Sequence, residues 1–312
     1  MLFERYDFTC RLETDAHLPY YKGSTFRGVF GRALKKVVCA LKKQKCDTCL
    51  LYTKCVYAQV FETPVSTNSK DSRIASPPHP FVIEPPLTGK TYFPAESTFD
   101  FALLLMGEVN NFISYFIYAF EQMGRIGIGK KINGHRGRFL LENVRCNEAV
   151  IYSSYDQKLK MSGPVGKLEL KETKISPDKN ICLKLNLKTP LRLKFANKFQ
   201  ADLPFHLLVR AMLRRISSLM NVYGNGEPPL DYSGLVKKAQ AVKTAEKNLL
   251  WYDWQRYSFR QDKKMLMGGI TGSVTYDGCI GEYLSLIDFC EQVHLGKQTT
   301  FGLGKIELEL IS

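Results

Sequence analysis

The chain has 312 residues, 45% of them hydrophobic and 24% charged, which is the composition of a folded protein long enough for two domains. Its formal net charge of +14 favours an extended polyanion as partner over a basic protein without one. No apolar run is long enough to cross a bilayer, and Glu4, Arg5 and Asp7 do not fit a signal peptide. We therefore expect a cytoplasmic protein with no membrane partner.

Strands and helices are expected in a regular order in the first half of the chain. Phe3 to Leu12 predicts a strand, and Ser24 can cap a helix whose apolar residues recur at helical spacing as far as Leu41. Two strands, a helix packed on a sheet and a further strand are then expected at residues 81–84, 98–106, 108–123 and 139–144. This order is typical of a ferredoxin-like unit.

The second half of the chain repeats this order. Residues 181–187 alternate as a strand does, and Asp202 with Pro204 opens a helix. A hairpin, a second helix and a closing strand are expected at residues 251–261 with 267–276, 283–293 and 306–311. We predict an α+β fold of two tandem ferredoxin-like (βαββαβ) domains, residues 1–180 and 181–312, with a glycine-rich loop before the last strand.

Two basic, glycine-rich segments occupy equivalent places, each after a helix and before a strand. They are Gly124 to Arg138 and His294 to Lys305. Glycines let the backbone approach a ligand, successive amides can face one anion, and lysines add charge, so both segments predict phosphate contact. A nucleotide-binding P-loop is excluded because it precedes a helix and needs Ser or Thr where Lys131 stands. A dinucleotide fingerprint is excluded because it also precedes a helix.

A cluster of cysteines follows the first predicted helix. The chain has nine cysteines and no export signal, which argues against a disulfide framework. Cys39, Cys46, Cys49 and Cys55 form an insertion whose central C-x-x-C pair suits tetrahedral zinc. We predict a structural zinc site at these four residues, with an iron–sulfur cluster and unligated thiols as the alternatives.

One loop gathers the residue types that acid–base catalysis needs. His17 is followed closely by Tyr20, Tyr21 and Lys22, so a base, phenols and a cation lie together between the first strand and the first helix. His294 is the second candidate base, although at the end of a helix it can equally serve a structural role beside the helix dipole.

Four parts of the sequence together resemble the CRISPR-associated endoribonucleases of the RAMP superfamily, which process precursor CRISPR RNA. These parts are Leu18 to Gly31, the run from Cys46 to Glu62, Tyr257 to Gln261 with Gly268, Gly269 and Gly272, and Gly296 to Gly304. The resemblance implies two ferredoxin-like domains and metal-independent cleavage of a repeat RNA. The ribose 2′-OH would attack the adjacent phosphate and leave a 2′,3′-cyclic phosphate and a 5′-OH.

The resemblance also implies roles for individual residues. A catalytic histidine in or just before the first helix corresponds to His17, with Tyr20 or Tyr21 assisting and Lys22 holding the phosphate; His294 is the second candidate. Tyr257 and Phe301 are available for stacking on bases. The cations expected to contact RNA are Arg27, Lys130, Arg136, Arg138, Arg210, Arg214, Arg256, Arg260, Lys297 and Lys305.

The expected partners are CRISPR repeat RNA or precursor CRISPR RNA and subunits of a CRISPR effector complex, with a homodimer left open. No cofactor is expected for catalysis. Two alternatives compete with the processing nuclease: a non-catalytic RAMP subunit that holds guide RNA, which would use the same loops and charge, and a zinc-dependent hydrolase.

Overall fold

A computed structural model describes the chain at residues 1–63, 77–160, 163–172, 175–176, 179–195, 199, 201–258 and 263–311. The chain forms two compact units, Leu2–Lys167 and Leu168–Ser312, the second of which includes Met1. Both units are α+β and are built on antiparallel sheets. No helix among the described residues is long and apolar enough to span a membrane.

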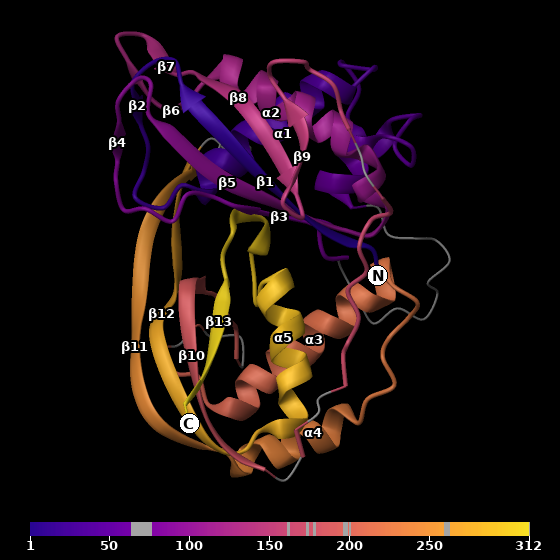
Figure 1. Cartoon of the computed structure of the whole chain (residues 1–312), viewed down its shortest axis with the longest axis vertical. Coiled ribbons are helices and arrows are strands. Elements are labelled where there is room, and N and C mark those ends of the chain that lie inside the picture. The colour runs from indigo at the N-terminus through magenta and orange to yellow at the C-terminus, as the bar shows by residue number, and fades with distance from the viewer. Residues whose placement is uncertain are drawn as a thin grey trace. The chain divides into compact units, whose positions relative to one another are not determined.

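The N-terminal unit is built on a five-stranded sheet in the order β3-β5-β1-β8-β9 (Figure 1). Its strands are β1 (Phe3–Leu12), β3 (Phe81–Glu84), β5 (Thr98–Met106), β8 (Phe139–Cys146) and β9 (Ala149–Ser153), and its helices are α1 (Gly23–Val38) and α2 (Ile113–Ile126). The succession β1-α1-β3-β5-α2-β8 is the predicted ferredoxin-like unit. The predicted bounds of β1, β3 and β5 are confirmed.

The core of this unit follows from the alternation along β1 and the helical spacing in α1. Tyr6, Phe8, Cys10 and Leu12 point inward, and Phe8 stacks on Phe101 with ring centroids 4.7 Å apart. Further aromatic pairs join the helices to each other and to the sheet; they are Phe26 with Phe101, Phe8 with Phe120, and Phe30 with Phe120. Each buried ring contributes about 2–3 kcal/mol.

The start and end of α1 differ from the prediction. The helix begins at Gly23 with Lys22 as its N-cap residue, and no side chain caps it. Ser24 instead lies in the first turn, and its buried Oγ has no hydrogen-bond partner. The helix ends at Val38, so Leu41 lies beyond it. The predicted Ser24 cap is therefore wrong, because the chain turns into the helix two residues earlier.

The first glycine-rich segment is a strand pair rather than an open loop. Residues 128–137 form β6 (Ile128–Ile132) and β7 (His135–Gly137), which join β2 (Ala16–His17) and β4 (Tyr92–Phe93) in a sheet of order β4-β2-β6-β7. A Cβ at Gly129 would lie 2.1 Å from the carbonyl oxygen of His17, and one at Gly137 would lie 2.3 Å from Cβ of Ala16. Glycine is needed here because β6 and β7 pack against the backbone of β2.

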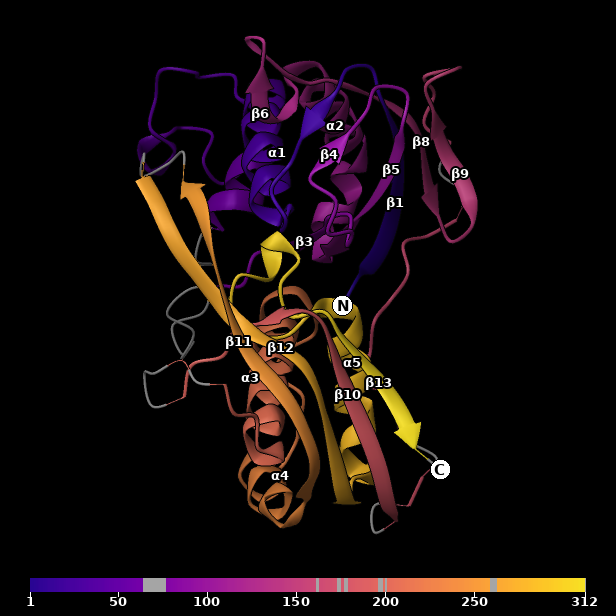
Figure 2. The ribbon, with the colours of Figure 1, turned by 90° about the vertical axis from the view of Figure 1, so that its left-hand side faces the viewer.

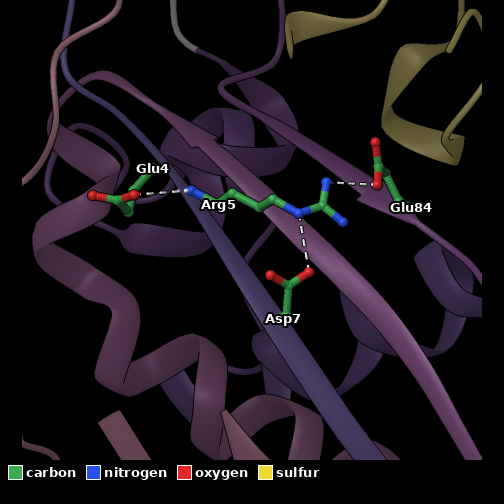
Figure 3. Close-up of polar contacts among 4 residues, drawn as sticks. All are labelled: Glu4, Arg5, Asp7 and Glu84. Carbon is green, nitrogen blue, oxygen red and sulfur yellow. Dashed lines mark hydrogen bonds and ion pairs between the residues drawn. The ribbon is translucent and has the colours of Figure 1, made fainter. Parts of the chain in front are cut away.

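A small charged network ties two strands of the N-terminal sheet that are not neighbours. Arg5 on β1 places Nε 3.0 Å from Oδ1 of Asp7 and Nη1 2.7 Å from Oε2 of Glu84 on β3 (Figure 3). The Glu84 side chain is only 8% exposed. Because a buried carboxylate needs a charged or hydrogen-bonding partner, Arg5 stabilises the ionised form of Glu84.

The C-terminal unit repeats the architecture with longer strands. Its sheet has the order β11-β12-β10-β13, and Figures 1 and 2 show α3 and α5 on one face of it. Its elements are β10 (Asn180–Leu191), α3 (Phe205–Tyr223), α4 (Tyr232–Lys238), β11 (Lys243–Ser258), β12 (Lys263–Cys279), α5 (Leu284–Val293) and β13 (Ile306–Ile311). The predicted hairpin is β11 and β12, and α4 was not predicted.

Short helical turns complete both units. Among the described residues, five are 3₁₀ turns, Cys46–Thr48, Gly107–Phe112, Ala239–Ala241, Gly281–Tyr283 and Thr299–Phe301, and one is a π-helical turn, Ala58–Glu62. The turn at Gly107–Phe112 leads directly into α2, so the helix predicted at 108–123 begins as a 3₁₀ turn.

Candidate active site

His17 is exposed and lies in the middle of the small sheet of the N-terminal unit. It pairs in register with Tyr92 on β4 and with Lys130 on β6. Because directly paired residues of antiparallel strands point to the same face, His17, Tyr92 and Lys130 share one face. The Tyr92 ring lies 5.1 Å from the imidazole, centroid to centroid. This face therefore combines an accessible imidazole with an accessible ammonium group.

Asp15 completes this group from the turn before β2. Its Oδ2 accepts a hydrogen bond from the Tyr92 hydroxyl at 3.0 Å, and its Oδ1 accepts one from the backbone N–H of Ala95 at 2.8 Å. The hydrogen bond from Ala95, the one from Tyr92 and the nearby His17 all lower the pKa of Asp15. Asp15 is therefore ionised across the neutral range. Sequence reasoning missed both residues, and Tyr92 is so distant in the chain that no spacing could have indicated it.

Two further residues of the predicted catalytic loop, Tyr21 and Lys22, are placed differently from His17. Lys22 is fully buried at 0% exposure, and its Nζ donates to the carbonyl oxygens of Thr88 at 2.6 Å and Tyr20 at 3.1 Å. Burial raises the pKa of Tyr21 well above its usual value, and the charge of Glu84 raises it further. The geometry contradicts phosphate binding by Lys22 and leaves Tyr21 a protonated phenol.

The cations of the N-terminal unit fall into two groups. Lys130 and Arg138 are exposed, although Nε of Arg138 lies 3.7 Å from Oε2 of Glu13. Arg136 is partly buried and donates to the carbonyl oxygen of Gly129, which supports the turn of the strand pair. Arg27 packs its guanidinium over the ring of Phe61 at 5.1 Å. Of these predicted RNA contacts, Lys130 is the one adjacent to His17.

His294, the second candidate base, is buried. The side chain is 0% exposed, its backbone is left-handed with φ +59°, and Nδ1 lies 3.1 Å from the carbonyl oxygen of Leu303. Arg215 on α3 donates to the carbonyl oxygens of Val293 at 2.8 Å and of His294 at 3.1 Å. These contacts support the structural alternative for His294 and close the C-terminal end of α5.

Several backbone amides of the terminal glycine-rich loop donate hydrogen bonds to acceptors in the same unit. Gly304 has φ +73°, and a Cβ there would lie 1.8 Å from the carbonyl oxygen of Leu295. Oγ1 of Thr189 on β10 donates to the carbonyl oxygen of Gly302 at 2.8 Å. The loop amides that donate to acceptors within the same unit are those of Leu295, Lys297, Phe301, Gly302, Gly304 and Lys305. The glycines therefore permit close backbone packing rather than an open phosphate cradle.

The predicted cations of the C-terminal unit are also mixed. Those with exposed side chains are Arg210, Arg214 and Lys297, and Lys305 is half-buried. Arg256 places its guanidinium over the ring of Phe301 at 4.9 Å, and Phe301 is itself buried, so its ring is covered. Arg260 and the side chain of Tyr257 lie outside the described part of the chain. The sequence predicted RNA contacts for Arg210 and Arg214 but did not indicate the structural role of Arg215. Spacing along the chain does not show which of these side chains is exposed.

The four cysteines of the insertion, Cys39, Cys46, Cys49 and Cys55, are partly exposed free thiols. Within the described residues, which include all four, no group of three or more His, Cys, Asp or Glu side chains is arranged to hold a metal ion. Tetrahedral zinc needs its ligands gathered around one point. The structure therefore gives no support to the predicted zinc site.

Comparison with known proteins agrees with this architecture. Residues 1–163 match the family model of the N-terminal domain AF_1859_N, and residues 185–306 match the model of the CRISPR-associated endoribonuclease Cas6. An uncharacterized protein of Archaeoglobus fulgidus is 25% identical over 298 residues, which cover 92% of this chain and 91% of that protein.

Solved structures of Cas6 share the fold. Thermus thermophilus Cas6 superposes with a TM-score of 0.54 at 14% identity, covering 99% of this chain and 98% of that one. A partial Cas6-RT-Cas1–Cas2 complex gives a TM-score of 0.57 at 12% identity, covering 99% of this chain, which spans only 46% of that longer chain. The chain therefore belongs to the AF_1859_N family through its N-terminal half, its residues 185–306 match the Cas6 endoribonuclease model, and its fold is the tandem ferredoxin-like fold of Cas6.

Proposed function

We propose that the protein binds CRISPR repeat RNA and cleaves precursor CRISPR RNA by metal-independent attack of a ribose 2′-OH on the adjacent phosphate. The products are a 2′,3′-cyclic phosphate and a 5′-OH. The observation that carries the proposal is the exposed imidazole of His17 on one sheet face with Lys130. A group that moves a proton and a cation that balances the charge on the phosphate are what this reaction requires.

Each group has one role in this scheme. His17 takes the proton from the 2′-OH, water supplies the proton that the leaving 5′-oxygen needs, and Lys130 stabilises the extra negative charge that the phosphate gains in the transition state. Lys130 replaces Lys22, whose ammonium is already bound to backbone carbonyls. Tyr21 is not a base, since burial raises the pKa of its hydroxyl.

RNA binding rests on the charge and on exposed cations in both units. The net charge is +14, and exposed basic side chains include Lys130, Lys131 and Arg138 in the N-terminal unit and Arg210 and Arg214 on α3. Contacts of this kind are made to phosphates and release counterions, so the affinity for repeat RNA falls as salt rises. Subunits of a CRISPR effector complex, like a homodimer, stay predictions.

A cleavage assay with repeat RNA in excess EDTA tests the proposal. We expect wild-type protein to cut the RNA and to leave a repeat with a 2′-deoxyribose at the cut site intact. His17→Ala should lose cleavage by about 10²–10⁴-fold while its Kd for RNA changes less than twofold. His206→Ala, on the partly exposed face of α3, is the matched control and should cleave normally.

Three outcomes would overturn parts of this proposal. Full activity of His17→Ala removes the assigned residue, and cleavage of the 2′-deoxy substrate removes the mechanism. Loss of activity in EDTA that zinc restores would instead support the zinc-dependent hydrolase. Tight repeat binding by wild-type protein without any turnover would support the non-catalytic RAMP subunit.

A further inference from the structure

We infer that Asp15 and Tyr92 are a positioning pair that fixes the imidazole of His17 and its charge. The inference rests on the proposed catalytic role of His17. Neither residue need touch the RNA, because both act through contacts with the imidazole or its immediate surroundings.

Contacts of Asp15 and Tyr92 join the segment before β2, the strand β2 itself and the segment of β4. Tyr92 lies opposite His17 in the β2–β4 register, and its ring is tilted by 50° against the imidazole at 5.1 Å. The far end of the same ring is held by Asp15 through the 3.0 Å hydrogen bond from its hydroxyl. Asp15 is in turn held by the N–H of Ala95, two residues beyond β4. The Tyr92 ring is thus fixed at both ends.

Such an arrangement limits the rotation of an exposed imidazole. A histidine on a short surface strand has several rotamers, and proton transfer requires one of them. The Tyr92 ring covers one side of the imidazole, so it restricts the side chain without blocking its other side. This is the role of a positioning residue.

Tyr92 is poorly suited to give up its own proton. Its hydroxyl hydrogen is already donated to Asp15, and this hydrogen bond raises the pKa of Tyr92 above its usual value. The phenol therefore stays protonated and engaged near neutral pH. We therefore do not assign Tyr92 the role of acid catalyst.

The charges around His17 act in opposite directions. The carboxylate of Asp15, two residues earlier on the same segment, is negative, the ammonium of Lys130, paired with His17 from β6, is positive, and Tyr92 on β4 is neutral. Removing each charge in turn should therefore move the pH dependence of cleavage in opposite directions. A purely structural role for Asp15 predicts no such pair of shifts.

The test compares Asp15→Asn, Tyr92→Phe and Tyr92→Ala with wild type in single-turnover cleavage at several pH values. We expect Tyr92→Ala to slow cleavage on the order of tenfold or more, because the ring is lost, and Tyr92→Phe to slow it only about threefold, because the ring is kept. Asp15→Asn should move the acid limb of the pH–rate profile down by roughly 0.5 unit, and Lys130→Met should move it up. Tyr155→Ala, at 98% exposure in the same unit, is the control and should behave as wild type.

A second readout does not depend on activity. The ring signal of His17 followed by NMR against pH, assigned with His17→Gln, should show its midpoint at lower pH in Asp15→Asn than in wild type. Unchanged rates, profiles and NMR midpoints in Asp15→Asn and Tyr92→Ala, while His17→Ala is inactive, would overturn the inference and leave the proposed function standing. An active His17→Ala would overturn both.

Discussion

The two glycine-rich basic segments have similar compositions and similar places in their units, yet the structure uses them differently. Residues 128–137 form a strand pair whose glycines let it pack on β2; Lys130, Lys131 and His135 are exposed on it, and Lys130 is paired with His17. The terminal segment from His294 to Lys305 is packed on the end of β10, with most of its residues buried. The glycine-rich composition therefore indicated, for both segments, that the backbone comes close to another group. It did not indicate which group that is.

The physical basis of this difference is the partner of each glycine. At Gly129 the close neighbour is the carbonyl of His17, so the strand pair brings cations to the candidate base. At Gly304 the close neighbour is the carbonyl of Leu295, within the loop itself. Under the proposed function the first segment serves the chemistry, whereas the second maintains the fold of its unit.

The largest expected effect comes from Gly304→Ala. The new Cβ would meet a backbone oxygen at a left-handed position, so we expect a loss of about 4 kcal/mol in the free energy of unfolding. Urea denaturation followed by circular dichroism measures it. Gly134→Ala is the matched control, since Gly134 has φ +85° with nothing within 4 Å of the new Cβ, and it should lose only about 1 kcal/mol. Equal losses would contradict the packed state of the terminal loop.

Arg215→Met should have the next largest effect. The variant removes the hydrogen bonds to Val293 and His294 and leaves their carbonyls unsatisfied, at a cost of about 2–3 kcal/mol. Burial lowers the pKa of Arg215 to about 10, because withdrawal from water disfavours the charged guanidinium. The neighbouring variant Arg214→Met, on the exposed side of α3, should have the same free energy of unfolding as wild type. A stable Arg215→Met would mean that the loop is held by other contacts.

The double variant Lys130→Ala with Lys131→Ala tests the functional half of the comparison. We expect kcat/KM for repeat RNA to fall about tenfold or more, because Lys130 is lost from the face of His17, and the salt slope of binding to decrease by about 1–2, because two exposed cations are lost. Lys297→Ala in the terminal loop is the comparison variant and should lower kcat/KM less than threefold. If the two variants lost activity equally, the terminal loop would also face the scissile phosphate.

The smallest effect is expected at Glu291 on α5, whose Oε1 accepts from the N–H of Leu308. Burial raises the pKa of Glu291, and Asp288 and Glu307 raise it further. A carboxylate with a raised folded-state pKa stabilises the fold at acid pH and loses that contribution as pH rises through the folded value. Glu291→Gln should therefore raise the free energy of unfolding at pH 7 by less than about 1 kcal/mol, and the gain should vanish near pH 4.

Thermal unfolding of Glu291→Gln at both pH values, with the exposed Glu309→Gln as control, checks this sign. A variant less stable than wild type at pH 7 would show that the Leu308 hydrogen bond outweighs the cost of the buried charge.

The sequence by itself determined the order of strands and helices and the tandem ferredoxin-like fold. Alternation in β1 and helical spacing in α2 depend only on which residues avoid water, and both signals are local. The surface position of His17 could also be predicted from the sequence, because a polar residue in a short connection between a strand and a helix is expected at the surface.

Only the tertiary structure decided which of the candidate groups are accessible and which act together. Their neighbours in the sequence predicted functional roles for Lys22 and His294, but both side chains are buried because distant segments cover them. Asp15 and Tyr92 carry no signal of their own, and strand register alone brings Tyr92 onto His17. Periodicity reports which face of an element avoids water; it does not report what covers that face, and that depends on contacts between residues far apart in the chain.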